Sequence, residues 1–269
     1  LFQSGAPSQM DLFDPKPMLQ KYDGQKFPGE IKYGNLAQAS AKVFGSPWKF
    51  AKHGQCGMEI SELLPNLAKV VDEITLIRSM TSGVNNHAQG LYAMNAGRIT
   101  SGRPALGSWL TYGLGSETEE LPGFVVMTSA GKTGQQPVSA RLWSSGFLPS
   151  KFQGIQFQAK GDPVQYLGSP DGVCQSTQRQ VVEEVMRLNG LLAQERIDPE
   201  IQTRIAQYEM AFKMQSSVPE LTDMSQESKA TLKMYGVKEA GDGSFASNCL
   251  LARRMAERGV RMIQLYHRA

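Results

Sequence analysis

The chain has 269 residues, of which 41% are hydrophobic and 20% are charged, and its formal net charge is +3. This composition is typical of a globular protein with enough length for a substantial core. The basic residues are scattered rather than clustered, so we expect no nucleic-acid partner. The sequence contains no run of eighteen apolar residues, which argues against a membrane span.

The three cysteines, Cys56, Cys174 and Cys249, are widely separated and have neither metal-ligand spacing nor the pattern of a disulfide framework. We expect all three to be small apolar side chains that fill space in the core. The chain begins with Leu inside an apolar run and stops directly after a predicted strand. We therefore expect it to be a fragment of a longer protein, truncated at both ends.

The beginning of the chain has the pattern of a buried strand that ends in a polar loop. An apolar pair is followed by Gly5 and Pro7, whose backbone preferences interrupt regular structure, and then by Ser8 and Asp11. In open α/β sheets, ligands bind at the carboxyl ends of the strands. Ser8 and Asp11 are therefore candidate site residues, although the same pattern is typical of an ordinary polar turn.

A second strand end is predicted near residue 80. Residues 60–73 carry apolar side chains at helical spacing, and Pro65 places the start of this helix near Leu64. Residues 74–77 (ITLI) are rich in β-forming residues and predict a short buried strand. This strand is followed by a second polar loop.

The segment after that loop favours a helix over residues 88–98 (AQGLYAMNAGR), with Gly97 at its end. Asn85 or Asn86 suits the N-cap position. His87 would then lie in the first turn, where free backbone N–H groups and the helix dipole favour an anion. Asn86 and His87 are therefore candidates to contact an anionic substrate. The alternative is a capped helix with a solvent-exposed histidine.

The rest of the chain alternates between predicted strands and helices. We expect a short helix at 36–43, a strand or ordered loop at 48–54, helices at 106–114, 175–195, 199–217, 225–235 and 244–258, and strands at 123–128 and 260–266. Residues 129–173 predict a long loop that could form a lid or a wall of a substrate site. The alternation indicates a largely parallel sheet with helices on both faces in a single domain, 1–269, with residues 175–235 as a helical insertion or cap.

Six motifs of the chain resemble the bacterial family known as domain of unknown function 1501. In order they are GAPSQMDLFDPKP (5–17), SELLPNLAKVVDEITLIRSM (61–80), NNHAQGLYAMNAGR (85–98), RPALGSWLTYGLGS (103–116), LPGFVV (121–126) and CLLARRMAERGVRMIQLYHRA (249–269). The resemblance extends over essentially the whole chain, and several long motifs in the same order make it specific. This family belongs to the alkaline phosphatase and sulfatase superfamily.

The resemblance implies a three-layer α/β/α sandwich of the alkaline phosphatase-like type around a mainly parallel sheet. It also implies two divalent metal ions, of zinc, calcium or magnesium, and hydrolysis of a phosphate or sulfate ester on a small molecule or a polysaccharide. Family members commonly carry a twin-arginine export signal, which implies a periplasmic or other extracytoplasmic location.

In that superfamily the nucleophile lies at the N-terminus of a helix that closes with a Thr-Gly-Arg-like sequence. Residues 95–98 (NAGR) resemble this sequence, and the sulfatase spacing then puts His87 near the nucleophile position. The sulfatase signature Cys-x-Pro-x-Arg does not occur, so a formylglycine nucleophile cannot form. The resemblance therefore assigns Asn86 and His87 to the roles of nucleophile, metal ligand or oxyanion contact.

At the first strand end, Ser8 stands where the superfamily has an acidic metal ligand, and Asp11 follows three residues later. The resemblance implies that Ser8 and Asp11 hold one metal. It implies that His267 either binds the second metal or interacts with a motif that lies beyond this chain. Because the metal ligands of that region are missing here, we expect the fragment to be inactive. One alternative is the same fold without catalysis, binding an anionic glycan or a secreted partner. Another is transfer or lyase action on sulfated polysaccharides.

Overall fold

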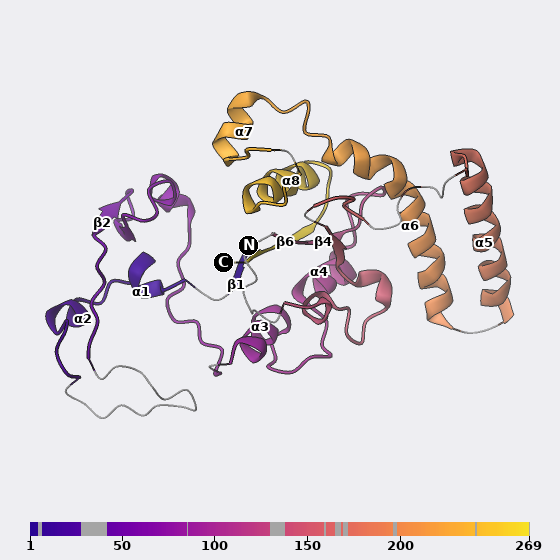
Figure 1. Cartoon of the computed structure of the whole chain (residues 1–269). Coiled ribbons are helices and arrows are strands. Elements are labelled where there is room, and N and C mark those ends of the chain that lie inside the picture. The colour runs from indigo at the N-terminus through magenta and orange to yellow at the C-terminus, as the bar shows by residue number, and fades with distance from the viewer. Residues whose placement is uncertain are drawn as a thin grey trace. The chain divides into compact units, whose positions relative to one another are not determined.

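The computed structural model describes residues 1–4, 7–27, 42–84, 86–129, 138–158, 160–164, 168, 172–195, 198–239 and 241–268. The helix predicted at 36–43 falls largely outside these ranges. Contacts within the chain define two compact units (Figure 1). The smaller unit is Ala6–Thr81, and the larger unit combines Leu1–Gly5 with Ser82–Ala269.

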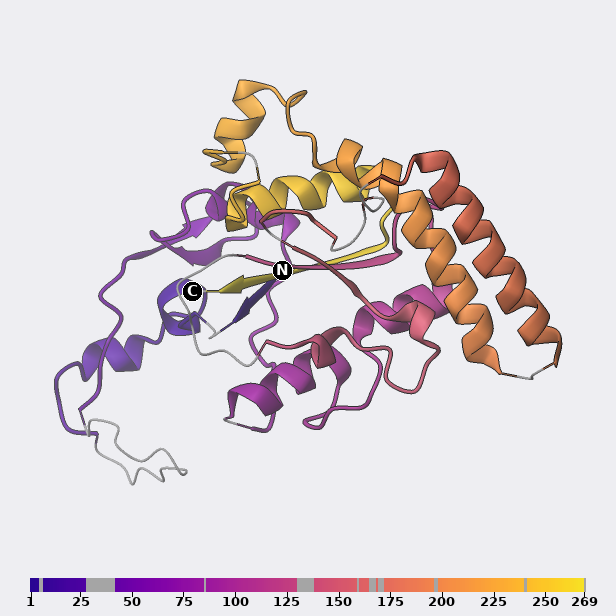
Figure 2. The ribbon, with the colours of Figure 1, turned by 45° about the vertical axis from the view of Figure 1, so that its right-hand side comes forward.

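The larger unit contains a four-stranded sheet (Figure 2). Its strands, in spatial order, are β1 (Phe2–Ser4), β6 (Met262–Arg268), β4 (Phe124–Thr128) and β5 (Ile155–Phe157). Each of these neighbouring pairs is parallel, so the carboxyl ends of the strands share one edge of the sheet. The strands predicted at the start of the chain, at 123–128 and at 260–266 are thus confirmed. Strand β5 was not predicted, since it lies inside the expected loop.

Helices make up most of the rest of the larger unit. They are α3 (His87–Ala96), α4 (Leu106–Leu114), α5 (Gln175–Glu195), α6 (Pro199–Thr222), α7 (Lys229–Tyr235) and α8 (Phe245–Glu257), with 3-10 turns η2 (Ala140–Trp143) and η3 (Ser150–Phe152). All of these α-helices were predicted. Helix α7 begins four residues later than expected because the side chain of Ser228 accepts a hydrogen bond from the Thr231 backbone N–H (3.0 Å) and caps it there.

Alternate side chains of the central strands point to opposite faces of the sheet, and both faces are covered. On one face, Val125, Met127 and Leu265 belong to a core cluster with residues of α6 and α8. On the other face, Phe124 and Tyr266 belong to a second cluster with residues of α3 and η2. The larger unit is therefore an α/β structure with a parallel sheet between helices, as the sequence predicted. No helix formed by the described residues is long and apolar enough to cross a membrane.

The smaller unit is built around a hairpin. Its elements are α1 (Gln9–Leu12), α2 (Pro17–Lys21), the antiparallel strands β2 (Phe50–His53) and β3 (Met58–Ser61), and the 3-10 helix η1 (Leu67–Glu73). The carboxylate of Asp72 in η1 accepts hydrogen bonds from the backbone N–H groups of Gln55 and Cys56, each 2.9 Å long, and so holds the turn between the two strands. These bonds keep the pKa of Asp72 below its ordinary value.

Two predictions in this unit are wrong. The helix predicted from near Leu64 to Glu73 is shorter and of another type, because only Leu67–Glu73 turns, as a 3-10 helix. Ile60, which shares the helical spacing of this segment, is instead buried in β3 opposite Ala51. Residues 74–77 form no strand, and Ile77 is exposed. A run of β-forming residues becomes a strand only where a neighbouring strand can pair with it.

The expectation for the cysteines is correct only in part. Cys249 in α8 is partly buried against the core, but Cys56 and Cys174 are exposed. Cys56 lies in the turn of the hairpin, and Cys174 directly precedes α5. A hairpin turn and the start of a surface helix are both exposed positions, so neither cysteine is surrounded by apolar side chains.

Candidate functional site

Helix α3 begins at His87 and is capped by Asn86. The side-chain Oδ1 of Asn86 accepts hydrogen bonds from the backbone N–H groups of Ala88 (3.0 Å) and Gln89 (3.4 Å), as the sequence predicted for an N-cap. Gly97 ends the helix in a left-handed conformation (φ 69°), which glycine adopts without strain. The side chain of His87 is exposed at the helix N-terminus, where the dipole favours a negatively charged ligand.

The other end of α3 is bonded to the central strand β6. The Asn95 side chain is buried; its Nδ2 donates to the Leu91 backbone oxygen (2.8 Å) and its Oδ1 accepts from the Tyr266 hydroxyl (2.9 Å). The Gln264 amide also donates to Oδ1. Burial raises the pKa of Tyr266 and outweighs the opposite effect of the bond to Asn95, so the phenol stays protonated and donates. These contacts fix α3, and with it the backbone that carries His87.

The sequence analysis missed this network. It treated Asn95 only as part of the closing sequence 95–98. A signal was nevertheless present, because Asn95 follows Leu91 by one helical turn and therefore lies on the buried face of the helix. A polar side chain at such a position requires hydrogen-bond partners. The partners come from a strand about 170 residues away in the sequence, and only the fold identifies them.

His267 directly follows Tyr266 in β6 and therefore points to the opposite face of the sheet. Its ring lies edge-on against Phe245 of α8, with the ring centroids 4.9 Å apart. Helix α3 packs on the Tyr266 face, through Asn95. His267 therefore lies on the sheet face that α8 covers, whereas His87 belongs to α3, which packs on the opposite face.

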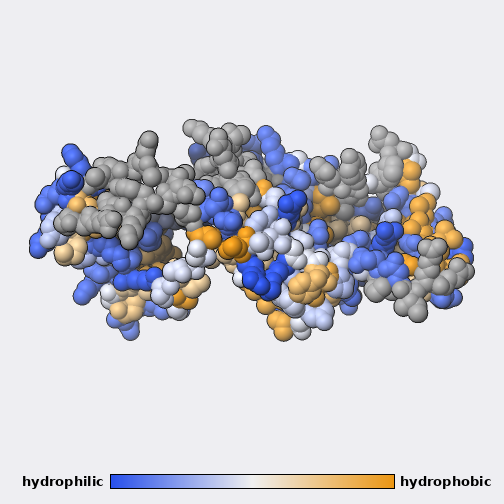
Figure 3. Space-filling view, turned by 90° about the horizontal axis from the view of Figure 1, so that it is seen from below, coloured by the Kyte–Doolittle hydropathy of each residue, from blue (hydrophilic) through white to orange (hydrophobic). Residues whose placement is uncertain are grey.

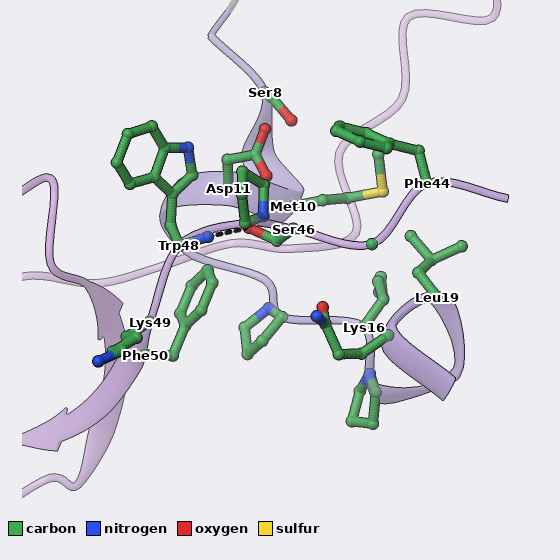
Figure 4. Close-up of a pocket in the computed structure, with 15 residues that line it drawn as sticks. Ser8, Met10, Asp11, Lys16, Leu19, Phe44, Ser46, Trp48, Lys49 and Phe50 are labelled. Atoms are coloured by element: carbon green, nitrogen blue, oxygen red, sulfur yellow. Dashed lines mark hydrogen bonds between the residues drawn. The ribbon is translucent and has the colours of Figure 1, made fainter. Parts of the chain in front are cut away.

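Ser8 and Asp11 belong to the smaller unit. Ser8 directly precedes α1, and its backbone oxygen accepts a hydrogen bond from the Asp11 backbone N–H (3.1 Å). The Ser8 side chain does not cap this helix. Both side chains line a pocket of about 570 Å³ (Figure 4). The structure thus brings together the two residues that the sequence analysis assigned to one metal.

The same pocket has an aromatic lining that the sequence analysis did not identify. Phe44, Trp48 and Phe50 contribute their rings, and Phe44 is 76% exposed. Figure 4 shows Trp48 and Phe44 on either side of Asp11. Neither Asp11 nor Lys49 forms an ion pair with any residue that the structure describes. The pocket therefore offers a carboxylate, an ammonium group and exposed aromatic rings to a ligand.

A metal ion would need more ligands than the described residues bring together. Among them, no three His, Cys, Asp or Glu side chains lie close enough to hold a metal. The oxygen atoms of Ser8 and Asp11 suit magnesium or calcium, whereas the imidazoles of His87 and His267 suit zinc. Ser8 and Asp11 lie in the smaller unit and the two histidines in the larger one. The described part of the chain thus provides individual donors rather than a complete coordination shell.

Cys174 is a separate polar centre at the start of α5. Its Sγ lies 3.1 Å from the hydroxyl oxygens of both Ser176 and Thr177. Hydrogen bonds from these two residues lower the pKa of the Cys174 thiol to about 6. Burial acts in the opposite direction on Cys249 and raises the pKa of that thiol.

At about pH 7 we expect iodoacetamide to alkylate Cys174 faster than Cys249, because the thiolate is the nucleophile. The rate at Cys174 should rise with a midpoint near pH 6, following its pKa of about 6. Mass spectrometry of quenched, digested samples measures both rates. The double variant Ser176→Ala, Thr177→Val should move the midpoint upward; an unchanged midpoint would contradict the hydrogen-bond explanation.

The larger unit is an α/β structure with a parallel sheet. Its helix α3 is capped by Asn86, and the dipole at this N-terminus favours an anion. A family model described as "Protein of unknown function (DUF1501)" matches residues 1–269. The chain belongs to this family, and the resemblance noted from its motifs is confirmed at that level. No curated protein and no solved structure matches the chain.

Proposed function

We propose that the chain belongs to a metal-dependent hydrolase of phosphate or sulfate esters, with a sandwich of the alkaline phosphatase-like type. The observation that carries the proposal is His87, exposed at the capped N-terminus of α3 while the far end of that helix is bonded to β6. The motif resemblance to sulfatase-like proteins supports the same reaction class. On that resemblance alone, we also propose twin-arginine export and a periplasmic location.

The geometry suggests a distinct role for each of the two residues at the helix start. Asn86 uses its Oδ1 to cap α3, so only its Nδ2 is available to donate to an ester oxygen. The imidazole of His87 is exposed and, when neutral, can act as the nucleophile or as a metal ligand. The helix dipole holds the anionic group of the ester near both side chains.

The proposed metal sites use Ser8 and Asp11 for one ion and His267 for another. A bound divalent ion would supply Lewis-acid polarisation of the ester oxygens. Asp11 suits this role because its carboxylate forms no hydrogen bond or ion pair with the described residues, so it is available to a ligand. The formylglycine chemistry of standard sulfatases does not apply, since the Cys-x-Pro-x-Arg signature is missing.

We expect the protein, purified as its gene encodes it, to contain a divalent metal and to hydrolyse a phosphate or sulfate monoester. His87→Ala should lower turnover by about 100-fold or more, which is typical for loss of a reacting group. Asp11→Asn should lower the metal content measured by plasma mass spectrometry. His53→Ala, a change in β2 outside the proposed site, serves as the matched control and should retain both properties.

A second candidate is a non-catalytic protein that binds an anionic glycan. The pocket beside Asp11 favours it, because Trp48 and Phe44 can stack on a sugar ring and Lys49 can pair with an anionic group. The measurements of metal content and turnover described above distinguish the two candidate functions. Metal-free protein, or turnover indifferent to both His87→Ala and Asp11→Asn, would contradict the hydrolase. Glycan binding that weakens in Trp48→Ala would then support the second candidate.

A further inference from the structure

The hairpin of the smaller unit carries a second pocket on one of its faces. Lys49 directly precedes β2 and Ala51 lies within it, so their side chains point to the same face of the hairpin. Both line a pocket of about 500 Å³, to which the segment after β3 contributes Ala68 and Lys69. We call it the hairpin pocket, and its lining includes Lys49, Ala51, Ile60, Glu62, Ala68 and Lys69.

Hydrogen bonds hold the hairpin pocket at both of its ends. Away from the hairpin turn, the Glu62 backbone N–H donates to the Lys49 backbone oxygen (2.9 Å), and the Glu62 Oε1 accepts from the Lys49 backbone N–H (3.0 Å). At the turn, Asp72 bonds η1 to the hairpin, and a Cβ atom at Gly54 would overlap with the Asp72 carboxylate. The walls of the pocket are therefore fixed before a ligand binds, which lowers the entropy lost on binding.

The floor of the hairpin pocket consists of apolar side chains. Ile60 is only 1% exposed, and Ala51 and Ala68 are small, which leaves room for a ligand. The volume of the pocket lies within the roughly 300–1,000 Å³ that is usual for small-molecule sites. Such a floor contacts the carbon atoms of a ring, whereas a free ion makes no use of it.

Two lysines give the hairpin pocket a positive charge. Lys49 and Lys69 are both exposed, and neither forms an ion pair with a residue that the structure describes. The Lys69 Nζ donates to the Asn66 Oδ1 (3.3 Å), which is uncharged. Glu62 is the one carboxylate among the described lining residues, so the two ammonium groups outnumber it. An anionic oxygen at this position would accept charge-assisted hydrogen bonds from both lysines.

The surroundings of the hairpin pocket favour a carbohydrate. Lys49 also lines the pocket beside Asp11, in which the rings of Trp48 and Phe44 are exposed, so the two pockets meet at this lysine. Figure 4 shows the Lys49 side chain beside the strand ribbon and directed away from Phe44. The surface of the smaller unit, at the left of Figure 3, is mostly hydrophilic. A polar ring that carries hydroxyl groups suits this surface better than an apolar ligand.

We propose that the hairpin pocket binds a sugar that carries a sulfate or phosphate group. Lys49 and Lys69 hold the anionic group, and the sugar ring lies against Ile60 and the two alanines. Sulfate and phosphate share a tetrahedral arrangement of anionic oxygens, so the same pair of ammonium groups can bind either. The site is distinct from His87 and Asp11, and it does not depend on whether the chain hydrolyses esters.

Isothermal titration calorimetry of the whole protein with glucose 6-sulfate and glucose 6-phosphate, at low salt, tests the proposal. All samples carry His87→Ala, so that hydrolysis contributes no heat and a failure of the proposed hydrolase leaves the result unaffected. At least one ester should bind with a dissociation constant of about 1 mM or tighter. Glucose and inorganic sulfate should each bind about tenfold more weakly, since each lacks half of the contacts. Absence of binding by both esters, or equal binding of inorganic sulfate, would overturn the proposal.

Lysine variants locate the bound anion. Lys49→Gln and Lys69→Gln should each weaken binding of the ester about tenfold, because each removes a hydrogen bond from a charged donor. Lys52→Gln is the matched control, since Lys52 is an exposed lysine next to Ala51 in β2 and therefore points to the opposite face of the hairpin. It should bind the ester with unchanged affinity. Binding that is indifferent to both Lys49→Gln and Lys69→Gln, or that weakens equally in Lys52→Gln, would rule out this site.

A steric variant tests the pocket itself and leaves both lysines in place. Ala51→Phe adds a ring to the floor, and phenylalanine is well suited to a strand, so the hairpin should tolerate it. This variant should weaken binding of the ester about tenfold, because the added ring occupies the space of the sugar. Ala51→Ser, which remains small, should bind like the unsubstituted pocket. Unchanged affinity in Ala51→Phe would show that the ester does not enter the hairpin pocket and would contradict the proposal.

Discussion

Replacement of Asn95 by leucine is expected to destabilise the larger unit by about 3 kcal/mol. The change removes the Oδ1 atom that accepts hydrogen bonds from the Tyr266 hydroxyl and from the Gln264 amide. Leucine has the same number and branching of non-hydrogen side-chain atoms, so the main loss is that of the hydrogen bonds. Each buried donor that loses its acceptor costs about 1–3 kcal/mol, and Tyr266 is completely buried.

Tyr266→Phe provides the control for this explanation, because it removes the donor together with the bond. Alone it should cost about 1 kcal/mol. In the Asn95→Leu background it should cost nothing or even recover stability, because the hydroxyl that it removes is already unpaired there. The double-mutant cycle should therefore give a coupling of about 1–2 kcal/mol. Additive effects would show that the two side chains do not depend on each other.

Urea unfolding followed by tryptophan fluorescence measures these differences. The sequence has three tryptophans, of which Trp48 lies in the smaller unit and Trp109 and Trp143 lie in the larger one. All variants are best made in a Trp48→Phe background, so that the signal reports only on the larger unit. Trp143 is well placed as a probe, because its ring lies 5.8 Å from that of Tyr266.

Local signals in the sequence were sufficient to predict most of the helices. Helix α4 has the predicted bounds, and α6 begins at Pro199 behind Asp198, whose side chain accepts a hydrogen bond from the Glu200 backbone N–H (2.9 Å). Such caps are formed by residues that are neighbours in the chain. They can be recognised without any knowledge of the fold.

The strands could not be predicted from local patterns alone, because a strand forms only where a partner strand from elsewhere in the chain lies beside it. Residues 74–77 and Ile155–Phe157 are both short and rich in β-forming residues, but only the second segment lies beside another strand, β4. Ile60 fits a helical spacing with the residues after it, but its pairing with Ala51 makes it part of a hairpin. In each case a distant partner decided the outcome, and the sequence does not name that partner.

Some features of the candidate site were likewise predictable from local spacing, whereas others became visible only in the fold. The cap at Asn86 and the proximity of Ser8 to Asp11 follow from short spacings and were predicted. The ring of Trp48 reaches the pocket of Asp11 from a segment more than thirty residues away, and this required the fold. For the same reason, the exposure of Trp109 and Tyr112 on α4 was not foreseen. Its sequence predicts a helix but does not show that the small residues face inward.

Two glycines of α4 should respond in opposite ways to replacement by alanine. Gly107→Ala is expected to destabilise the larger unit by about 2 kcal/mol, because the new Cβ would lie 2.6 Å from the ring of Phe124. Gly113→Ala is expected to stabilise it by about 0.5 kcal/mol, because no atom lies within 4 Å and alanine is the better helix former. Unfolding in the same Trp48→Phe background measures both changes in stability.

The comparison separates packing from helix propensity, because each variant adds one methyl group to the same helix. Phe124 cannot move away freely, since its ring is also close to the position that a Cβ at Gly154 would occupy (2.8 Å). The cost of Gly107→Ala therefore measures how tightly α4 is held against β4. If both alanines stabilise the unit equally, α4 is loosely packed and could rotate.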